Sequence, residues 1–484
     1  MNNSDICIII SKNKEVIMFS NFLNSKHDIC KKLVDRLSSK FEYVSLLGKQ
    51  ITGDNVRVTT FNTSINDSME TQNGFVVKIY GGKAYSEYSF SDIDENNIDD
   101  IEKKVVETVH VLDDDSLLHI SGKALEDEPL VKEFSRPMES EPYSVQEIIA
   151  KYNEYKGYIH SKSDKIIQSM LMFERYETSS MFISKNRDLK QNFSWCIAVA
   201  IAVSKKDDKI QMARDYIACN DPRGAVDGLK DKLDDLVKLA EDLLNATMIE
   251  PGVYDIITNP SITGLIAHEA FGHSVEMDMF LKKRARARKY INKPVASSLV
   301  NMHDGAAATY SCASYFFDDE GTLAQDTLII KNGILLTGIC DAVSGAQLGH
   351  KSTGNGRRES ANRKAYTRMT NTFFEPGNDK LEDMIKSVKH GYMLFDTNNG
   401  MEDPKNWNIQ CTAEYGREIK DGKFTGKIVA PVVMSGYVPD LLMSISMISD
   451  DFKILGSGHC GKGHKEWVTV SDGGPCLKAR CKLG

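Results

Sequence analysis

The feature that most constrains this chain is a pair of histidines five residues apart, with a glutamate beside the first. His268 and Glu269 are followed by His273, and the mostly apolar residues 262–267 predict the buried start of a helix. Imidazole nitrogens are common zinc ligands. In the usual zinc helix H-E-x-x-H, the histidines are four residues apart and share one face. At 3.6 residues per turn, a spacing of five turns the second imidazole roughly 140° away from the first.

A regular helix therefore cannot direct both imidazoles at one ion. One extra residue in the helix, a π-bulge, would bring them back to the same side, and such bulges are frequent at functional sites. We expect Gly272, directly before the second histidine, to permit the distortion, because glycine has the widest backbone freedom. The spacing predicts an irregular helix with a catalytic metal site; a structural metal and satisfied core histidines are the alternatives.

A catalytic zinc site needs a third protein ligand, since such sites take three and leave one position open. The glycine-rich stretch 456–464 offers His459, Cys460 and His464. A thiolate is a good zinc ligand, but spacing alone does not choose among the three. Glu269 is not needed as a ligand and has the chemistry of a general base.

Composition excludes several classes of protein. The 484 residues carry a net charge of −8, which argues against a broad nucleic-acid surface or an anionic-membrane surface. No apolar run approaches the ~18–20 residues of a membrane span, and no secretory signal is evident. The ten cysteines include no C-x-x-C pair, which is typical of reduced thiols in the cytoplasm. We expect a cytoplasmic protein that binds neither nucleic acid nor membrane.

Hydrophobic patterning predicts an α+β fold. In the N-terminal half, helices are expected to layer on mixed or antiparallel sheets. In the C-terminal half, Asn332-Gly333 and Asp421-Gly422 mark hairpin turns, which favours a β-rich barrel or sandwich that also carries the metal-site helix. Ser144 and Glu147 form a capping box ahead of one helix, and residues 226–248 predict a single long amphipathic helix.

Five segments are expected along the chain. They are an N-terminal extension at 1–35, which opens with a hairpin, a first α+β subdomain at 36–111, an acidic and irregular linker at 112–141, a second α+β subdomain at 142–249, and a β-rich catalytic domain with the metal site at 250–484.

Several motifs together resemble the TldD/PmbA family of metallopeptidases. Residues 268–273 read H-E-A-F-G-H and residues 275–278 read V-E-M-D, similar to the family signature. Residues 353–360 (T-G-N-G-R-R-E-S) and 368–372 (R-M-T-N-T) also match, and G-H-C-G-K at 458–462 resembles the C-terminal loop of the family. The resemblance is strong from about 226 to 484 and weaker from about 40 to 110.

The resemblance implies a cytoplasmic, zinc-type metallopeptidase that cuts small or unfolded peptides, in some members leader peptides. It implies His268, His273 and Cys460 as ligands of one Zn²⁺ and Glu269 as the catalytic carboxylate. It also implies a dimer, either with itself or with a TldE/PmbA-type paralogue that lacks the H-E-x-x-x-H motif, and a peptide held extended as an added strand.

The chain departs from the family pattern after Lys462. The family tends to continue with a variable residue and then Gly-Gln, whereas here Gly463-His464-Lys465 follows, and Cys476 and Cys481 add two thiols. Two other functions stay open. One is a non-catalytic peptide-binding subunit of a two-subunit peptidase with a structural metal, and the other is a metal-dependent hydrolase of small amides.

Overall fold

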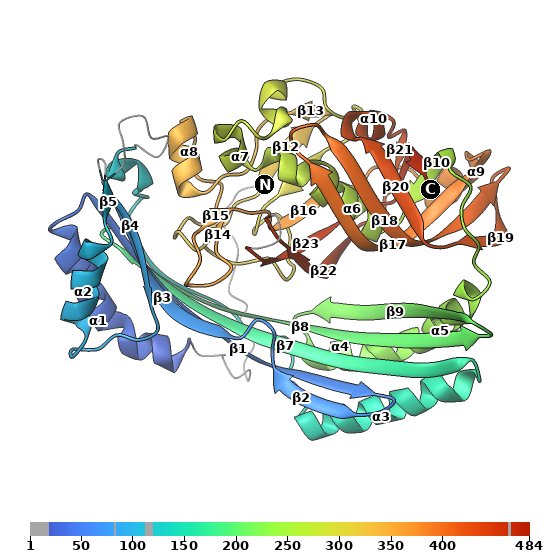
Figure 1. Cartoon of the computed structure of the whole chain (residues 1–484), viewed down its shortest axis with the longest axis horizontal. Coiled ribbons are helices and arrows are strands. Elements are labelled where there is room, and N and C mark those ends of the chain that lie inside the picture. The colour runs from blue at the N-terminus through green and yellow to red at the C-terminus, as the bar shows by residue number, and fades with distance from the viewer. Residues whose placement is uncertain (1–18, 82–83, 112–119, 463–465) are drawn as a thin grey trace.

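The computed structural model describes residues 19–81, 84–111, 120–462 and 466–484 (Figure 1). The predicted N-terminal hairpin, part of the acidic linker and His464 lie outside the described residues.

The N-terminal half is built on one nine-stranded sheet in the order β5-β4-β3-β1-β7-β8-β6, with β2 beside β1 and β9 beside β8. Figure 1 shows it as a long curved layer beneath the rest of the chain. The longest strands are β1 (Tyr43–Thr59), β7 (Ile166–Ser184) and β8 (Arg187–Lys206). The others are β2 (Thr63–Asp67), β3 (Gln72–Gly81), β4 (Ala84–Phe90), β5 (His110–Val111), β6 (Leu130–Arg136) and β9 (Lys209–Cys219).

Strands from both predicted α+β subdomains lie in this single sheet, because β1 pairs with β7 from Ser45↔Ser184 to Thr59↔Met170. The sheet therefore does not separate residues 36–111 from residues 142–249. The boundary at residue 249 stays a prediction.

Strand β6 corrects the expectation of an irregular linker over residues 112–141. It runs parallel to β8 from Leu130↔Arg187 to Arg136↔Phe193, which makes the sheet mixed. Phe134 stacks on Phe316 with ring centroids 5.0 Å apart. Residues 112–141 are acidic in composition, and the mostly exposed residues of β6 do not show a strand pattern. The strand depends on its pairing with β8, and strand propensity depends on such context.

Helices cover the two ends of the sheet. Helices α1 (Asn21–Ser38) and α2 (Ile98–Glu107) share a core with β1 and β3, whereas α3 (Val145–Lys162) packs under β7 (Figure 1). The predicted capping box is confirmed: the Ser144 side chain accepts from the Glu147 amide, and the Glu147 carboxylate accepts from the Ser144 amide.

The predicted long helix over residues 226–248 is wrong in its extent and continuity. The structure has α4 (Pro222–Gly228), a 3₁₀ turn at Leu229–Lys232 and α5 (Leu233–Leu243). Asp221 caps α4 through the Gly224 amide, so the helical segment begins earlier than predicted. The regular helix stops at Gly228, a residue of low helix propensity.

The C-terminal half confirms the expected β-rich, barrel-like architecture. Five strands form a closed ring in the order β10-β17-β18-β20-β24, and β24 pairs back with β10. These strands are β10 (Gly252–Thr258), β17 (His390–Asp403), β18 (Asn408–Lys420), β20 (Val432–Tyr437) and β24 (Leu477–Leu483).

A six-stranded sheet lies beside the barrel in the order β13-β12-β11-β16-β23-β22. Its strands are β11 (Met302–Asp304), β12 (Thr327–Lys331), β13 (Ile334–Leu335), β16 (Asn371–Phe374), β22 (Lys453–Cys460) and β23 (Val468–Gly474). Strand β22 is at the edge of this sheet and ends at Cys460.

Buried ion pairs join the C-terminal half to the N-terminal sheet. Lys78 on β3 pairs with Glu320 at 2.6 Å, and Arg358 forms a two-armed contact with Glu87 on β4 at 2.9 and 3.1 Å. No described helix is long and apolar enough to cross a membrane.

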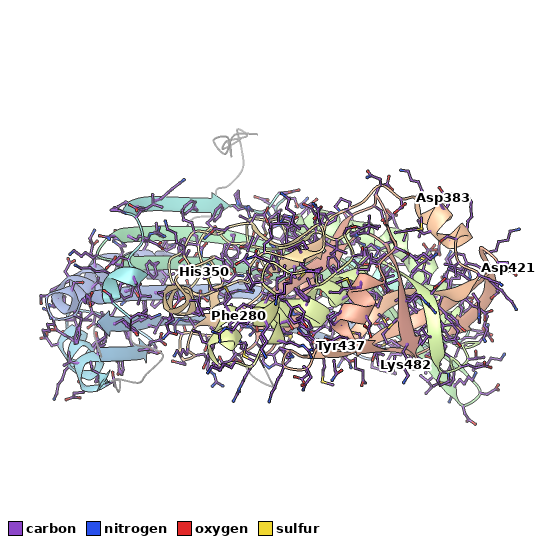
Figure 2. The ribbon with its side chains drawn as sticks, turned by 90° about the horizontal axis from the view of Figure 1, so that it is seen from above. Phe280, His350, Asp383, Asp421, Tyr437 and Lys482 are labelled. Atoms are coloured by element: carbon purple, nitrogen blue, oxygen red, sulfur yellow. The ribbon has the colours of Figure 1, made fainter. Side chains whose placement is uncertain are left out.

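Seen from above, the molecule is elongated (Figure 2). Asp383 in α9 (Leu381–Lys386) and Asp421 after β18 lie at its barrel end, and His350, after α8 (Ala342–Leu348), lies toward the other end.

Candidate metal centre

The two histidines lie on a helix that changes its winding between them. Helix α6 (Pro260–Leu265) is capped at its N-terminus by Asn259, whose side chain accepts from the Ile262 amide. It continues as a π-helix over Ile266–Gly272, and the amide of His273 donates to the carbonyl of His268, five residues back. This confirms the extra residue that the histidine spacing requires.

Gly272 has a different role from the expected one. Its φ of −58° and ψ of −50° are ordinary helical values, so its backbone freedom is not used. A Cβ at this position would lie 2.1 Å from Sδ of Met369. Glycine fits here because its missing side chain leaves room for Met369 against the helix.

The π-helix brings both imidazoles to Cys460 at the end of β22. The ring centroids of His268 and His273 are 5.3 Å apart, and the rings are nearly perpendicular at 86°. Sγ of Cys460 lies 3.3 Å from Nε2 of His273. One ligand atom from each residue lies within 4.8 Å of the others, so the three side chains form a group that could hold a metal ion.

The other candidate ligands lie outside this group. His459 precedes Cys460 on β22 and hydrogen-bonds Glu70 at 2.6 Å, as expected when neighbouring strand residues point to opposite faces. The thiol of Cys476 donates to Asp451 at 3.4 Å, and that of Cys481 faces the Ser435 carbonyl. His464 lies outside the described residues.

Electrostatics favour an anionic sulfur in the group. Burial would raise the pKa of Cys460, but the adjacent imidazoles of His273 and His268 lower it well below its usual value. In return, although burial opposes it, the Cys460 sulfur raises the pKa of His268 to about 9 and that of His273 well above its usual value. A thiolate and two imidazoles suit zinc, so the donor chemistry fits that ion.

Glu269 lies beside the donors without joining them. Its carboxylate oxygens are 4.0 Å from Nε2 of His268 and 3.9 Å from Nε2 of His273. Its side chain rests against β17, where a Cβ on Gly400 would come within 2.6 Å of Cγ of Glu269. Burial raises the pKa of Glu269, as suits a group that accepts and returns a proton.

Glu276 supports His273 from behind, a role that sequence reasoning did not assign. Its Oε2 lies 3.3 Å from Nδ1 of His273 and 3.2 Å from Nζ of Lys462, and Oε1 lies 3.5 Å from Nε of Arg368. Burial would raise its pKa, but Lys462, His273 and Arg368 hold it well below the usual range. A carboxylate on the second nitrogen fixes the tautomer and orientation of a ligating histidine. The spacing of three between His273 and Glu276 is a signal that could have indicated this contact.

Ser274 and Glu402 form a second contact that the sequence did not indicate. The Ser274 hydroxyl donates to Glu402 on β17, and Nε1 of Trp407 donates to Ser274 at 2.7 Å. Burial raises the pKa of Glu402 to about 8. This chain of contacts fixes the 3₁₀ turn His273–Val275 to the barrel.

The group opens into a cleft of about 1330 Å³ between the barrel and the β9 side of the N-terminal sheet. Its walls include Arg214–Tyr216 of β9, Leu239 of α5, Asn399–Glu402 of β17 and Ser457–Cys460 of β22. Glu269 also lines the cleft. The volume exceeds the ~300–1,000 Å³ of a typical small-molecule site.

Comparisons with known proteins agree with the geometry. Residues 251–479 match the model of the PmbA/TldA metallopeptidase C-terminal domain. A metalloprotease of Methanocaldococcus jannaschii is 30% identical over 300 residues, which are 61% of this chain and 65% of that protein. A zinc metalloprotease TldD homolog of Saccharolobus solfataricus is 32% identical over 249 residues, 51% of this chain and 55% of that protein. The chain thus matches between about half and two thirds of the length of these relatives.

The fold extends the likeness over the whole chain. The crystal structure of TldE from Thermococcus kodakarensis superimposes with a TM-score of 0.74 over 96% of this chain and 99% of that one, at 16% identity. The family model and the named relatives confirm the resemblance to the TldD/PmbA family, which lies in the C-terminal half, where residues 251–479 match the PmbA/TldA metallopeptidase C-terminal domain.

Proposed function

We propose that the chain is a metal-dependent peptidase that hydrolyses small or unfolded peptides in the cleft, with one Zn²⁺ held by His268, His273 and Cys460. The observation that carries the proposal is the convergence of these three donors, with Glu269 beside them, at an open cleft. Three protein ligands and an open side are typical of catalytic zinc sites, whereas structural sites are closed by four. The names of the relatives, metalloprotease and zinc metalloprotease, support this function.

A zinc ion at these donors would supply Lewis-acid polarisation of the scissile carbonyl and of water. Glu269 takes the proton of the attacking water at a carboxylate oxygen and returns it to the leaving amine. Glu276 holds the His273 ring through Nδ1, so that Nε2 stays directed toward Cys460. The Glu402–Ser274 contact fixes the turn that carries His273.

The edge position of β22 supports an extended peptide as the substrate. In the described part of the chain this strand pairs with β23 alone, and it lines the cleft up to Cys460. A peptide that adds to a sheet edge is held mainly through backbone hydrogen bonds, with little demand on its sequence. Such binding suits leader-peptide removal or peptide maturation.

The family likeness also supports a proposal for the partner and the compartment. We propose a cytoplasmic dimer, either of this chain with itself or with a TldE/PmbA-type paralogue that lacks the H-E-x-x-x-H motif. The TldE structure that shares the fold supports such a pairing. The presence of Glu269 at the cleft favours a catalytic subunit over a non-catalytic peptide-binding one.

Substitution Glu269→Gln tests the proposal. It keeps the size of the side chain and all three donors, so we expect unchanged zinc content and a fall in peptide cleavage of about 10²–10⁴-fold. The measurements are metal analysis and cleavage of an unstructured peptide with and without chelator. Glu133→Gln, at an exposed site on β6, is the matched control and should cleave at the parent rate.

If Glu269→Gln cleaves peptide at the parent rate, Glu269 is not the group that transfers the proton. Parent-protein cleavage that survives complete metal removal would exclude a metal-dependent peptidase. Cleavage of small amides but not of peptides would favour the alternative hydrolase.

A further inference from the structure

Two cysteines away from the metal donors lie opposite each other on adjacent strands of the N-terminal sheet. Cys196 on β8 and Cys219, the last residue of β9, are direct cross-strand partners. The Cys196 thiol lies 3.1 Å from the Cys219 carbonyl oxygen, and the Cys219 thiol lies 3.3 Å from the Asp221 carbonyl oxygen. Both cysteines are free thiols; Cys196 is buried and Cys219 is partly exposed.

The spacing of such a pair suits a disulfide. Residues directly opposite on antiparallel strands have Cβ atoms about 4.5–5.5 Å apart, and a disulfide needs about 3.5–4.5 Å. A small approach of two strands that are already hydrogen-bonded is therefore enough. The backbone also holds the two thiols together, because β8 and β9 pair continuously from Cys196↔Cys219 to Lys206↔Lys209.

The partly exposed member is also the more reactive one. The hydrogen bond between the two thiols lowers the pKa of Cys219, against the effect of burial, and the same hydrogen bond together with burial raises the pKa of Cys196. The thiolate is the nucleophile in thiol–disulfide exchange. Cys219 can thus react first with a small disulfide in solution. The buried Cys196 is placed to react with Cys219 afterwards.

We propose that Cys196 and Cys219 are a reversible redox pair, oxidised by low-molecular-weight disulfides such as oxidised glutathione. The Cys219 thiolate attacks one sulfur of the small disulfide, forms a mixed disulfide and releases one thiolate. The buried Cys196 thiol passes its proton to the released small thiolate and attacks the Cys219 sulfur, which forms the Cys196–Cys219 bond and releases the second thiolate. In sum, two protein thiols are oxidised and one small disulfide is reduced to two thiols.

The pair is placed where oxidation can reach the cleft. Strand β9 supplies Arg214–Tyr216 to the cleft wall. Tyr216 is three residues before Cys219 on the same strand. Trp195, next to Cys196, donates from Nε1 to the carbonyl of Gly456 on β22 at 2.8 Å, the strand that ends at Cys460. A bond between β8 and β9 would restrain both contacts, and any effect on cleavage rests on the proposed function.

The test is disulfide mapping of the full-length protein in glutathione buffers of increasing oxidation. After acid quench and alkylation, we expect a linked peptide pair containing residues 196 and 219, which is lost again in reduced glutathione. Cys196→Ser should stop at a mixed disulfide on Cys219, and Cys219→Ser should take up no glutathione at Cys196. Cys481→Ser, a buried strand cysteine opposite Tyr254, is the matched control and should oxidise like the parent.

Alkylation kinetics give a second readout that does not depend on peptidase activity. Cys219 should react at least about ten-fold faster at pH 7.5 than the buried cysteines, as expected for a thiolate. A linked peptide seen only in denaturant would overturn the proposal, and so would a mixed disulfide on Cys219 that Cys196 never resolves. If mapping succeeds while cleavage is absent in both redox states, the redox pair stands and the peptidase function fails.

Discussion

Glu276 is a buried carboxylate that orients one of the predicted metal donors, His273. Its contacts with His273, Lys462 and Arg368 hold one imidazole in place and balance the charge behind it. Removing the charge in Glu276→Gln should weaken zinc binding about 10–100-fold, the usual effect of losing a carboxylate partner of a ligating histidine. Competition with a chromophoric chelator measures the affinity, and circular dichroism confirms that the compared samples are folded. Affinity equal to that of the parent protein would show that His273 needs no such support.

Cys460 is the donor whose identity spacing left open. Substitution Cys460→Ala removes the sulfur that lies 3.3 Å from Nε2 of His273, so we expect the zinc content of the purified protein to fall to a small fraction of one ion per chain. Elemental analysis checks this, with Cys476→Ala as the control that keeps full zinc. If Cys460→Ala keeps one zinc ion per chain, Cys460 is not the third ligand, and His459 or His464 takes that role.

Gly272 gives a test of packing at the π-helix. In Gly272→Ala the new methyl group meets Sδ of Met369, and overpacking of this kind usually costs about 1–3 kcal/mol of unfolding free energy. Urea unfolding measures the change. Gly157→Ala in α3 is the matched control, because a Cβ there meets nothing within 4 Å and alanine favours a helix interior by about 0.5–1 kcal/mol. Equal stability of Gly272→Ala and the parent would show that Met369 moves aside freely.

At the scale of elements, local chemistry was predictable and pairing was not. The π-helix follows from the spacing of His268 and His273, and the start of α3 follows from Ser144 and Glu147, because both depend on contacts within one or two turns. Strand β6 and the pairing of β1 with β7 depend on partners far along the chain. The registers of β6 with β8 and of β1 with β7 leave no signal in either segment alone.

The capping box at α3 has a measurable share of stability. Ser144→Ala removes the acceptor for the Glu147 amide, and loss of such a cap typically costs about 1 kcal/mol. Chemical denaturation gives the value. Ser161→Ala, at an exposed position within the same helix, should leave stability unchanged or slightly higher, since alanine is the better helix former. Equal values for the two variants would mean that the cap contributes nothing to global unfolding.

At the scale of the whole molecule, the site is a product of the contact between the two halves. The histidine helix and Cys460 could be identified from sequence motifs, but the cleft could not, because its walls combine β9 and α5 with β17 and β22. For the same reason Glu402 was missed: it lies 128 residues from Ser274, its partner. Motifs identify donors, and tertiary contacts decide what surrounds them.

The Glu87–Arg358 pair tests how firmly the halves are joined. Arg358→Met removes the two-armed partner of Glu87, whose carboxylate keeps the charges of Lys78 and Lys364 nearby. We expect a loss of about 3 kcal/mol, the lower end of the range for breaking a buried ion pair. Replacing both residues, in Glu87→Leu with Arg358→Met, should recover most of the loss. Denaturant titrations of the three proteins compare them, and a single variant as stable as the double one would contradict the buried pairing.

The same pair predicts a dependence of stability on pH. Burial would raise the pKa of Glu87, but Arg358 lowers it below its usual value. Since the folded pKa is below the unfolded value of about 4.3, the pair stabilises fully above that pH and less as the pH falls through the folded pKa. Unfolding free energies below about pH 4.3 should therefore fall less steeply in the double variant than in the parent. Identical slopes would mean that Glu87 does not contribute to acid unfolding.

The closed barrel also affects the order in which the protein folds during synthesis. Strand β24 completes the ring by pairing with β10, the first strand of the C-terminal half, and His273 and Cys460 are 187 residues apart in the chain. Contacts between such distant segments form slowly, after much chain entropy has been lost. On the ribosome, the two histidines emerge long before their sulfur partner and before the ring can close. Under the proposed function, all three donors are available to an ion only after residue 460 has been synthesised, so capture of the ion is a late event in biogenesis.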